Sequence, residues 1–411
     1  MKQSRTFAIR NRLHDIPAVN MGSDVEPVLD VIFGISSPEA EFAVEYQKVV
    51  TAVELGIKIV TDVSTVLDDT LRRRVLAELP IAYRTVPTYE IYQKIKAGRS
   101  SPRSAVLEVV ESHVSAGVDC ITVHASGAPW RANHCPDFDE RLIPITSRGG
   151  AMMQEIAAER AGCNPYLESF DDLLDICADY GVTLSLATTA RPGSVADALS
   201  RAHLAEMNRQ AELVSRAHAR EVNVVVEVLG HVPLDLIPTY CEAARREFDG
   251  APFGALGPCT TDVAMTHDDV AGAIGAAVAA MHGTSFIACI TAGEHCHLPT
   301  VDEVASAIKA FQVAVHSGWI ARTGLLDRDI AMSKARNSND WRAMADNALH
   351  SEDARRVISA NGYHSGQVCT MCGGSCPIVR TNALFRSDLG EYAAGPLAWS
   401  EDDTGMPCRN H

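Results

Sequence analysis

The chain has 411 residues, of which 46% are hydrophobic, and its formal net charge is −16. This composition supports a large buried core and excludes an intrinsically disordered chain, and an acidic surface without a basic stripe excludes nucleic acid as an expected partner. No apolar run reaches the roughly 18 residues needed to cross a bilayer, and the first residues lack a signal-peptide core. We therefore expect a cytoplasmic protein without membrane contact, whose 12 cysteines are thiols, metal ligands or core residues.

A short β-branched run followed by an amphipathic helical stretch recurs along most of the chain. Helical stretches such as "EAEFAVEYQKVVTAVEL" and "VDEVASAIKAFQVAVHSG" separate the runs, and several end at glycine, as helices often do. The predicted strands are, in chain order, 28–37, 58–65, 81–89, 120–126, 142–150, 182–189, 223–231, 252–258 and 285–291.

This alternation, with nearly continuous apolar strands, predicts an α/β fold with a parallel sheet. Eight such units close a (β/α)8 TIM-type barrel, so one run is surplus. The weakest is 252–258, "PFGALGP", because glycine and proline disfavour strands. A doubly wound open sheet is the rival fold, but the chain has no G-x-G-x-x-G turn. We predict a catalytic barrel over 1–324 and a helical C-terminal region over 325–411.

Polar residues follow the predicted strands, at the end where barrels carry their chemistry. Any single Ser, Thr or Asp could instead cap the next helix. Because the whole set shares one end of successive strands, we interpret it as a candidate site. Its members are Asp62, Ser64, Tyr89, His124, Ser147, Arg148, Arg191, Glu227, His231, Thr261, Asp262, Glu294 and His295.

Two strand ends carry similar pairs, "VEVLGH" with Glu227 and His231 and "TAGEH" with Glu294 and His295. Neutral imidazoles from two strand ends can converge on one divalent metal, zinc or iron. His297 is a substitute ligand. A lone histidine is more often a hydrogen-bonded structural residue, so the metal site depends on the two rings meeting.

Two turns place arginine near glycine after a strand, "SRGG" (147–150) and "RPG" (191–193). Exposed backbone N–H groups together with a guanidinium suit a phosphate group. Gly-rich turns are common, so either turn alone is a weak signal.

Near the C-terminus, "CTMCGGSC" places Cys369, Cys372 and Cys376 in a C-x2-C-x3-C pattern. A 4Fe-4S cluster normally takes four cysteines, so three would leave one iron open to S-adenosylmethionine. A structural zinc site is the alternative and would need a closed fourth ligand, for which His364, Cys408 and His411 are candidates. The chain lacks the second C-x2-C or H-x3-H pair usual in zinc knots.

The chain resembles the phosphomethylpyrimidine synthase (ThiC) family over most of its length. The resemblance is carried, in order, by "TDVST", "RTVPTYE", "GVDCITVH", "SRGGA", "NPYLESFDDLL", "VTLSL" with "RPG", "VVVE" with "GHVPLD", "GAPFGALGPCTTD", "GEHCHLP", "MSKAR" and "CTMCGGSC". So many ordered motifs with a terminal cysteine cluster form a specific signal.

The resemblance implies a non-standard radical S-adenosylmethionine enzyme that rearranges aminoimidazole ribotide into hydroxymethylpyrimidine phosphate for thiamin. It implies a (β/α)8 barrel in a homodimer in which the cysteine segment reaches the partner's active site, with flavodoxin or ferredoxin as electron donor. It assigns Cys369, Cys372 and Cys376 to the cluster and His231 and His295 to an additional metal. It assigns the phosphate turn to Ser147, Arg148 and Gly149, and the substrate pocket to Tyr89, His124, Arg191 and Glu227.

Several positions depart from the family's pattern. Val31 and Phe33 stand roughly where asparagines are expected, Thr188 replaces a pocket aspartate, and a tyrosine before "LGP" is missing around Gly254. "EVLGH" stands for "EGPGH", "THD" (266–268) stands for "YDH", and the second cysteine gap is one residue short. We interpret these changes as altered ring-binding contacts beside retained radical machinery.

Three functions remain open from the sequence. The first is formation of the thiamin pyrimidine, and the second is a paralogous reaction such as that of 5-hydroxybenzimidazole synthase, which makes a cobalamin lower ligand. In either case Glu227, His124 and Tyr89 are the candidates for proton handling. The third is a two-histidine metallohydrolase barrel with a structural zinc tail. A catalytically inactive relative is the minor alternative.

Overall fold

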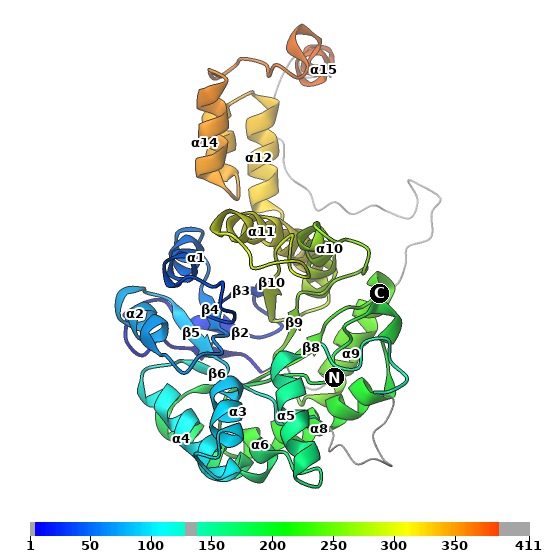
Figure 1. Cartoon of the computed structure of the whole chain (residues 1–411). Coiled ribbons are helices and arrows are strands. Elements are labelled where there is room, and N and C mark those ends of the chain that lie inside the picture. Colours follow the sequence, from blue (N-terminus) through cyan, green and yellow to red (C-terminus); the bar gives the residue numbers. More distant parts are fainter. Residues whose placement is uncertain (1–4, 128–137, 386–411) are drawn as a thin grey trace. The chain divides into compact units, whose positions relative to one another are not determined.

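The computed structural model describes residues 5–127 and 138–385 and divides the chain into two compact units, Met1–Leu325 and Leu326–His411. The first unit contains a closed barrel of eight parallel strands in the order β10-β3-β4-β5-β6-β7-β8-β9 (Figure 1). The predicted (β/α)8 barrel is confirmed. The barrel strands are β3 (Val28–Phe33), β4 (Ile59–Asp62), β5 (Ala82–Thr85), β6 (Cys120–Val123), β7 (Thr183–Leu186), β8 (Val224–Leu229), β9 (Phe253–Leu256) and β10 (Phe286–Cys289).

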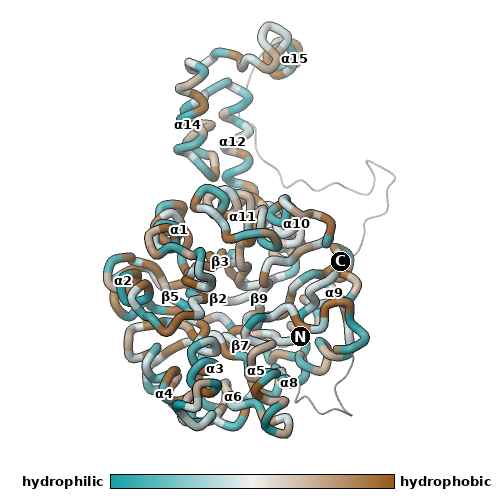
Figure 2. Tube along the Cα trace, in the orientation of Figure 1, coloured by the Kyte–Doolittle hydropathy of each residue, from teal (hydrophilic) through white to brown (hydrophobic). Residues whose placement is uncertain are grey.

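Helices follow the strands and surround the barrel (Figure 1). Figure 2 shows both hydrophilic and hydrophobic residues along these helices, as expected where one face packs on the strands. The helices of the first unit are α1 (Phe42–Glu54), α2 (Thr70–Glu78), α3 (Thr88–Lys96), α4 (Pro102–Ser115), α5 (Arg148–Glu159), α6 (Pro165–Glu168), α7 (Phe170–Tyr180), α8 (Arg201–Ala219), α9 (Ile237–Glu247), α10 (Asp268–Met281) and α11 (Val301–Thr323), with 3-10 turns η1 (Val195–Asp197) and η2 (Leu234–Leu236).

Of the nine predicted strands, 142–150 is the one that is not a strand in the structure. The run 252–258, predicted to be the weakest, does contribute a barrel strand, so that prediction was wrong. Residues 253–256 form β9, where Gly254 pairs with Phe286 and leaves room for its ring. In 142–150 the N–H groups of Leu142 and Ile143 donate to Asp197, at 2.9 and 3.0 Å, instead of to a strand, and the segment leads into α5.

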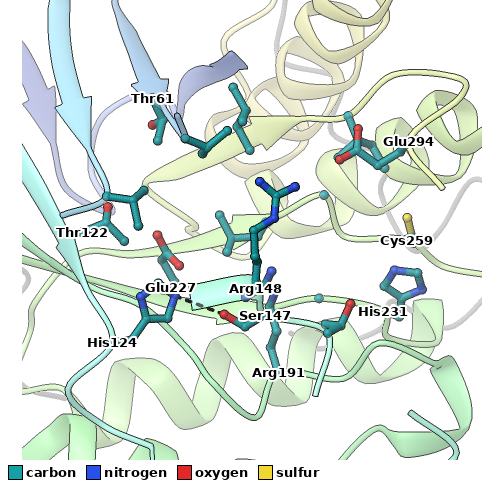
Figure 3. Close-up of a pocket in the computed structure, with 18 of the residues that line it drawn as sticks. Thr61, Thr122, His124, Ser147, Arg148, Arg191, Glu227, His231, Cys259 and Glu294 are labelled. Carbon is teal, nitrogen blue, oxygen red and sulfur yellow. Dashed lines mark hydrogen bonds between the residues drawn. The ribbon is translucent and has the colours of Figure 1, made fainter. Parts of the chain in front are cut away.

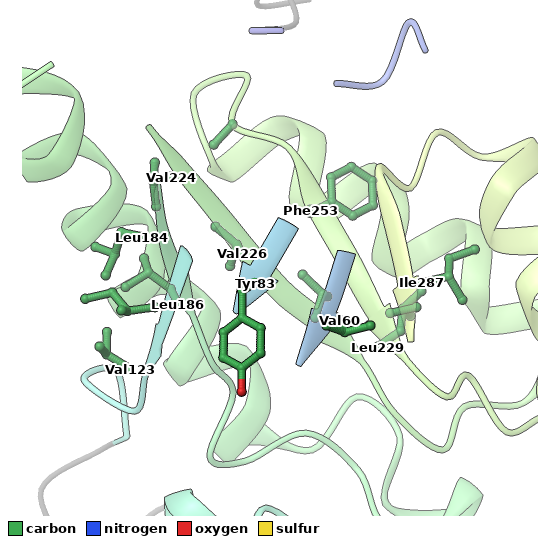
Figure 4. Close-up of a cluster of buried hydrophobic side chains, with 14 of the residues drawn as sticks. Val60, Tyr83, Val123, Leu184, Leu186, Val224, Val226, Leu229, Phe253 and Ile287 are labelled. Carbon is green, nitrogen blue, oxygen red and sulfur yellow. The ribbon is translucent and has the colours of Figure 1, made fainter. Parts of the chain in front are cut away.

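The core has two parts. Outward-facing strand residues such as Val60, Leu184 and Val226 pack under the helices and are buried (Figure 4). Each such burial contributes about 1.5–3 kcal/mol. A smaller cluster joins the first residues of several strands to a short antiparallel pair, β1 (Phe7–Ile9) and β2 (Val19–Met21). This pair therefore packs at the amino ends of the strands and leaves their carboxyl ends for the site.

The second unit is helical, as predicted, and carries the cysteine segment. It is thinly packed, because Ala335, Ala345 and Cys376 are the buried residues in its described part. Its elements are α12 (Asp327–Asn337), α13 (Trp341–Asn347), α14 (Ser351–Ala360), η3 (Gly373–Ser375) and α15 (Pro377–Phe385). Among the described residues of the chain, no helix has the length and apolar character needed to cross a membrane.

Candidate active site

A cavity of about 300 Å³ opens at the carboxyl ends of the barrel strands (Figure 3). It is lined by nine of the residues predicted from the sequence, which lie on or after five strands, β5, β6, β7, β8 and β10. These are Tyr89, His124, Ser147, Arg148, Arg191, Glu227, His231, Glu294 and His295. The barrel thus brings together residues that are up to about half of the chain apart in sequence.

His124 is enclosed between two hydroxyl groups. Its Nδ1 lies 3.0 Å from Thr88 Oγ1, and its Nε2 lies 3.1 Å from Ser147 Oγ (Figure 3). Burial lowers the pKa of His124 to about 3, so the imidazole is neutral. Because both ring nitrogens already have partners, a proton exchanged with a ligand would pass through a hydroxyl or displace one.

The turn 147–150 begins α5. The Gly150 N–H donates to Ser147 Oγ at 3.1 Å, which caps the helix and leaves the first helical N–H groups, of Arg148 and Gly149, without intrahelical partners. A Cβ on Gly149 would stand 2.3 Å from His124 Cε1, so this glycine is required by the close approach of the imidazole. Exposed N–H groups at a helix N-terminus suit an anion.

Two arginines line the cavity here, Arg148 within this turn and Arg191 after β7. The Arg148 guanidinium lies 5.8 Å from the centre of the Tyr89 ring, a cation–π distance. Arg191 donates to Thr188 O at 3.1 Å. The Arg191 turn is held by a residue that the sequence did not reveal, the buried Glu206, which accepts the N–H groups of Thr189 and Ala190 at 2.7 and 2.6 Å.

Glu227 forms the floor of the cavity and is buried. Burial raises the pKa of its carboxyl group, while the Arg84 guanidinium opposes that shift. The pairing of β8 with β9 shifts register between Glu227 and Leu229, and such irregularities often redirect a side chain beside a site. Thr188, at the position of the expected aspartate, is fully buried and donates to Glu227 O at 2.6 Å, so its hydroxyl is used within the fold.

The floor also contains residues that sequence reasoning missed. On β3 the residues facing the barrel interior are Asp30 and Ile32, because Asp30 contacts Thr61 and Arg84 and Ile32 lines the cavity. Val31 and Phe33, predicted to be ring contacts, instead pack in the outer core. An Asp and an Arg inside otherwise apolar strand runs were the signal that could have found Asp30 and Arg84.

His231 and His295 meet, with ring centres 5.0 Å apart. His231 Nδ1 lies 2.8 Å from Asp262 and His295 Nδ1 lies 3.1 Å from Asp268. A carboxylate on Nδ1 orients the ring and leaves Nε2 for a metal. His297 is instead engaged by Glu303 at 2.9 Å. The donor set fits an open divalent site with two protein ligands, since no three His, Cys, Asp or Glu side chains converge within 5–127 and 138–385.

The cysteine segment forms a compact turn in the second unit. The backbone N–H groups of Cys372 and Met371 lower the pKa of the Cys369 thiol, which favours the thiolate that binds iron. The Trp341 and Tyr363 rings stack at 4.3 Å, and Tyr363 OH lies 2.8 Å from Thr370 Oγ1, one residue after Cys369.

Three thiols with this spacing fit an iron–sulfur cluster. Within the described part of the chain, however, their sulfur atoms do not converge on a point that could hold a metal ion. Of the fourth-ligand candidates, Cys408 and His411 lie outside the described residues.

The radical SAM ThiC family matches residues 1–383 of this chain. The chain belongs to this family. Phosphomethylpyrimidine synthase from Natronomonas pharaonis is 38% identical over 88% of this chain and 77% of its own length. The enzyme of the same name from Desulforamulus reducens is 36% identical over 88% and 85%, and that from Ignicoccus hospitalis is 34% identical over 96% and 92%.

Membership of the radical SAM ThiC family makes this chain a radical SAM lyase-type enzyme, with a 4Fe-4S cluster and S-adenosylmethionine as its cofactors, and supports a role in thiamin pyrimidine synthesis. The metallohydrolase alternative from the sequence is therefore wrong. Among solved structures, a dihydropteroate synthase from Coxiella burnetii covers 72% of this chain and 94% of its own at 12% identity, with a TM-score of 0.42, too low for a shared site to be inferred.

Proposed function

We propose that this chain rearranges aminoimidazole ribotide, or a closely similar 5′-phosphoribosyl nucleotide, as in hydroxymethylpyrimidine phosphate synthesis. The observation that carries the proposal is the charge layout of the cavity. Two arginines and the start of α5 lie around one wall, and the buried carboxyl group of Glu227 lies at the floor. A phosphate group would bind at the wall with the two arginines, and a nitrogen ring that carries an N–H group would bind at the Glu227 carboxyl group.

At the phosphate end, the backbone N–H groups of Arg148 and Gly149 and the Arg148 guanidinium would bind the anion. Arg191 adds a second positive charge to the same cavity. The Ser147 hydroxyl is shared between Gly150 and His124, so it would position the turn more than bind the phosphate.

At the ring end, the floor of the cavity presents three polar side chains, Tyr89 after β5, Thr122 on β6 and Glu227 on β8. The Thr122 hydroxyl is buried and has no partner among the described residues, and it lines the cavity beside Tyr89 and Glu227. Tyr89, His124 and Glu227 are the groups that would hold or move protons on the ring. Their burial keeps water from reactive intermediates.

The cofactors would be held by residues already described. Cys369, Cys372 and Cys376 would bind the cluster, which would supply the electron that cleaves S-adenosylmethionine into methionine and an adenosyl radical. His231 and His295 would bind a divalent metal, zinc or iron, with open positions that could orient the amino acid part of the cosubstrate.

The proposal includes a homodimer in which the cysteine segment meets the partner's cavity, with flavodoxin or ferredoxin supplying electrons. Large apolar side chains exposed around that segment, Met371 at 90% and Leu384 at 74%, support a covering surface.

A second candidate is the 5-hydroxybenzimidazole synthase reaction on the same ribotide. The departures from the family pattern favour this second reaction. Thr188 supplies a hydroxyl where an aspartate is expected, and no tyrosine is present around Gly254.

The test is the product of aminoimidazole ribotide with S-adenosylmethionine and dithionite under strict anaerobiosis. Hydroxymethylpyrimidine phosphate, identified by mass together with 5′-deoxyadenosine, is the expected result, and hydroxybenzimidazole would establish the second candidate. Recovery of unchanged ribotide beside 5′-deoxyadenosine would reject both and point to another substrate.

A further inference from the structure

The floor of the cavity holds a buried guanidinium, that of Arg84, to which the proposed function assigns no role. Arg84, on β5, is 3% exposed. Its Nε donates to Thr61 Oγ1 at 2.6 Å, its Nη2 donates to Asp30, and its Nη1 lies 3.3 Å from Ser185 Oγ and 3.4 Å from Glu227 Oε1. One side chain thus joins residues of β3, β4, β7 and β8.

The space around Arg84 is built from a second set of residues. The Phe286 ring lies 5.1 Å from the Arg84 guanidinium, at a cation–π distance. That ring occupies the volume in front of Gly254, where a Cβ would stand 2.0 Å from Phe286 Cε1. Gly254 therefore leaves room for the Phe286 ring, and Arg84 and Phe286 together fill the barrel interior at the floor of the cavity.

Glu227 uses its two oxygens differently. Oε1 faces Arg84 and Ser185, each at 3.4 Å. Glu227 lines the cavity, and among the described residues no hydrogen bond is made to its Oε2, so this oxygen is available to a ligand.

We infer that Arg84 is a positioning residue that sets ring specificity, by holding Glu227 so that Oε2 accepts a hydrogen bond from an N–H group of the substrate ring. The identity of that ring rests on the proposed function. The ligand class is a nitrogen heterocycle with an amino or ring N–H donor, and an analogue without the donor would leave Oε2 buried and unpaired.

The charge state of Glu227 supports this role. Burial raises its pKa, Arg84 and Arg191 lower it, and Asp30 raises it. Tyr89 and Cys120 also lie within electrostatic range of Glu227. Because an opposite charge at this distance shifts a pKa by about 1–3 units, removing Arg84 raises the pKa of Glu227 further.

The first test compares aminoimidazole ribotide with imidazole ribotide, which lacks the amino group. The wild type should bind the amino form about 10- to 100-fold more tightly, and Arg84→Met should bring the ratio close to one. The acid limb of kcat/KM should also move up by about one pH unit in Arg84→Met. Arg84→Lys, which keeps the charge but not the fork, should be intermediate, and Arg216→Met, in an exposed cation–π contact on α8, should match the wild type.

The second test needs no ligand. A carboxyl group whose pKa is raised by folding stabilises the native state at low pH, and that contribution is lost as pH rises through the folded pKa. The melting temperature of Arg84→Met should therefore fall more steeply than that of the wild type as pH rises above about 4.3, the pKa of an unperturbed glutamate side chain. In the double variant Arg84→Met/Glu227→Gln, most of this additional pH dependence of the melting temperature should disappear. The remainder should be the contribution of Asp30, which also loses its partner Arg84.

An unchanged ligand ratio and acid limb in Arg84→Met, or an identical pH slope with and without Glu227→Gln, would overturn the inference. If the wild type binds neither ribotide, the proposed function fails, and the melting series still decides whether Arg84 acts through Glu227.

Discussion

The barrel cavity and the cysteine segment differ in how firmly the chain holds their functional groups. In the cavity His124 has a hydroxyl on each nitrogen, and Glu227 lies against a guanidinium inside a closed sheet. In the second unit the cysteines lie on a mostly exposed turn supported by one aromatic stack and a few hydrogen bonds. The cavity side chains are therefore fixed by the fold, whereas the cysteine turn is held by fewer contacts, as is usual for segments that order further when they bind a metal.

The largest expected effect separates the two regions completely. Cys372→Ala should abolish cluster loading and 5′-deoxyadenosine formation, because a cluster held by two thiolates is not retained. The melting temperature of the barrel should stay that of the wild type, as should ribotide binding by calorimetry. Iron content and the visible absorption of the anaerobically reconstituted protein measure the loss, and a coloured, active variant would contradict the assignment.

A metal-site substitution within the barrel should come next. His295→Ala should remove the additional metal and lower kcat/KM by about 10- to 100-fold or more, with the cluster intact. His297→Ala is the matched control two residues away, since His297 is engaged by Glu303. Metal content by mass spectrometry checks both, and equal metal loss in the two variants would mean that His297 is also a ligand.

A single added methyl group should sharpen the contrast in rigidity. Gly149→Ala should destabilise the barrel by roughly 1–3 kcal/mol, because the imidazole of His124 lies 2.3 Å from the new Cβ and is fixed by two hydroxyls. Gly374→Ala, in the cysteine segment, has nothing within 4 Å and should be nearly neutral. Denaturant unfolding measures both, and similar losses would refute the difference in packing.

The smallest effect tests the support of the cysteine turn. Trp341→Ala removes the stack on Tyr363 and the hydrogen bond to Gln367 O at 2.8 Å, each worth about 1 kcal/mol. We expect slower cluster loading and faster cluster loss to a chelator, with ribotide affinity unchanged. Trp341→Phe should retain most of the stacking and behave more like the wild type, whereas equal cluster loss in both variants would show that the hydrogen bond, not the stack, holds the turn.

The sequence by itself determined the alternation of strands and helices, the polar residues that follow the strands and the cysteine spacing. These are local patterns, since periodicity, end-of-strand position and ligand spacing can be read within a few residues. The (β/α)8 barrel could be predicted from these patterns because eight successive strand–helix units commonly close into one barrel.

Only the tertiary structure decided which way the side chains on β3 point, because alternation gives a period of two and the pairing register sets its phase. Asp30 and Arg84 acquired their role in the same way. A charge in an apolar strand is unexplained until closure places its partners from distant strands within a few ångströms. The run 142–150 had strand-like composition, but its backbone groups found Asp197 instead of a neighbouring strand.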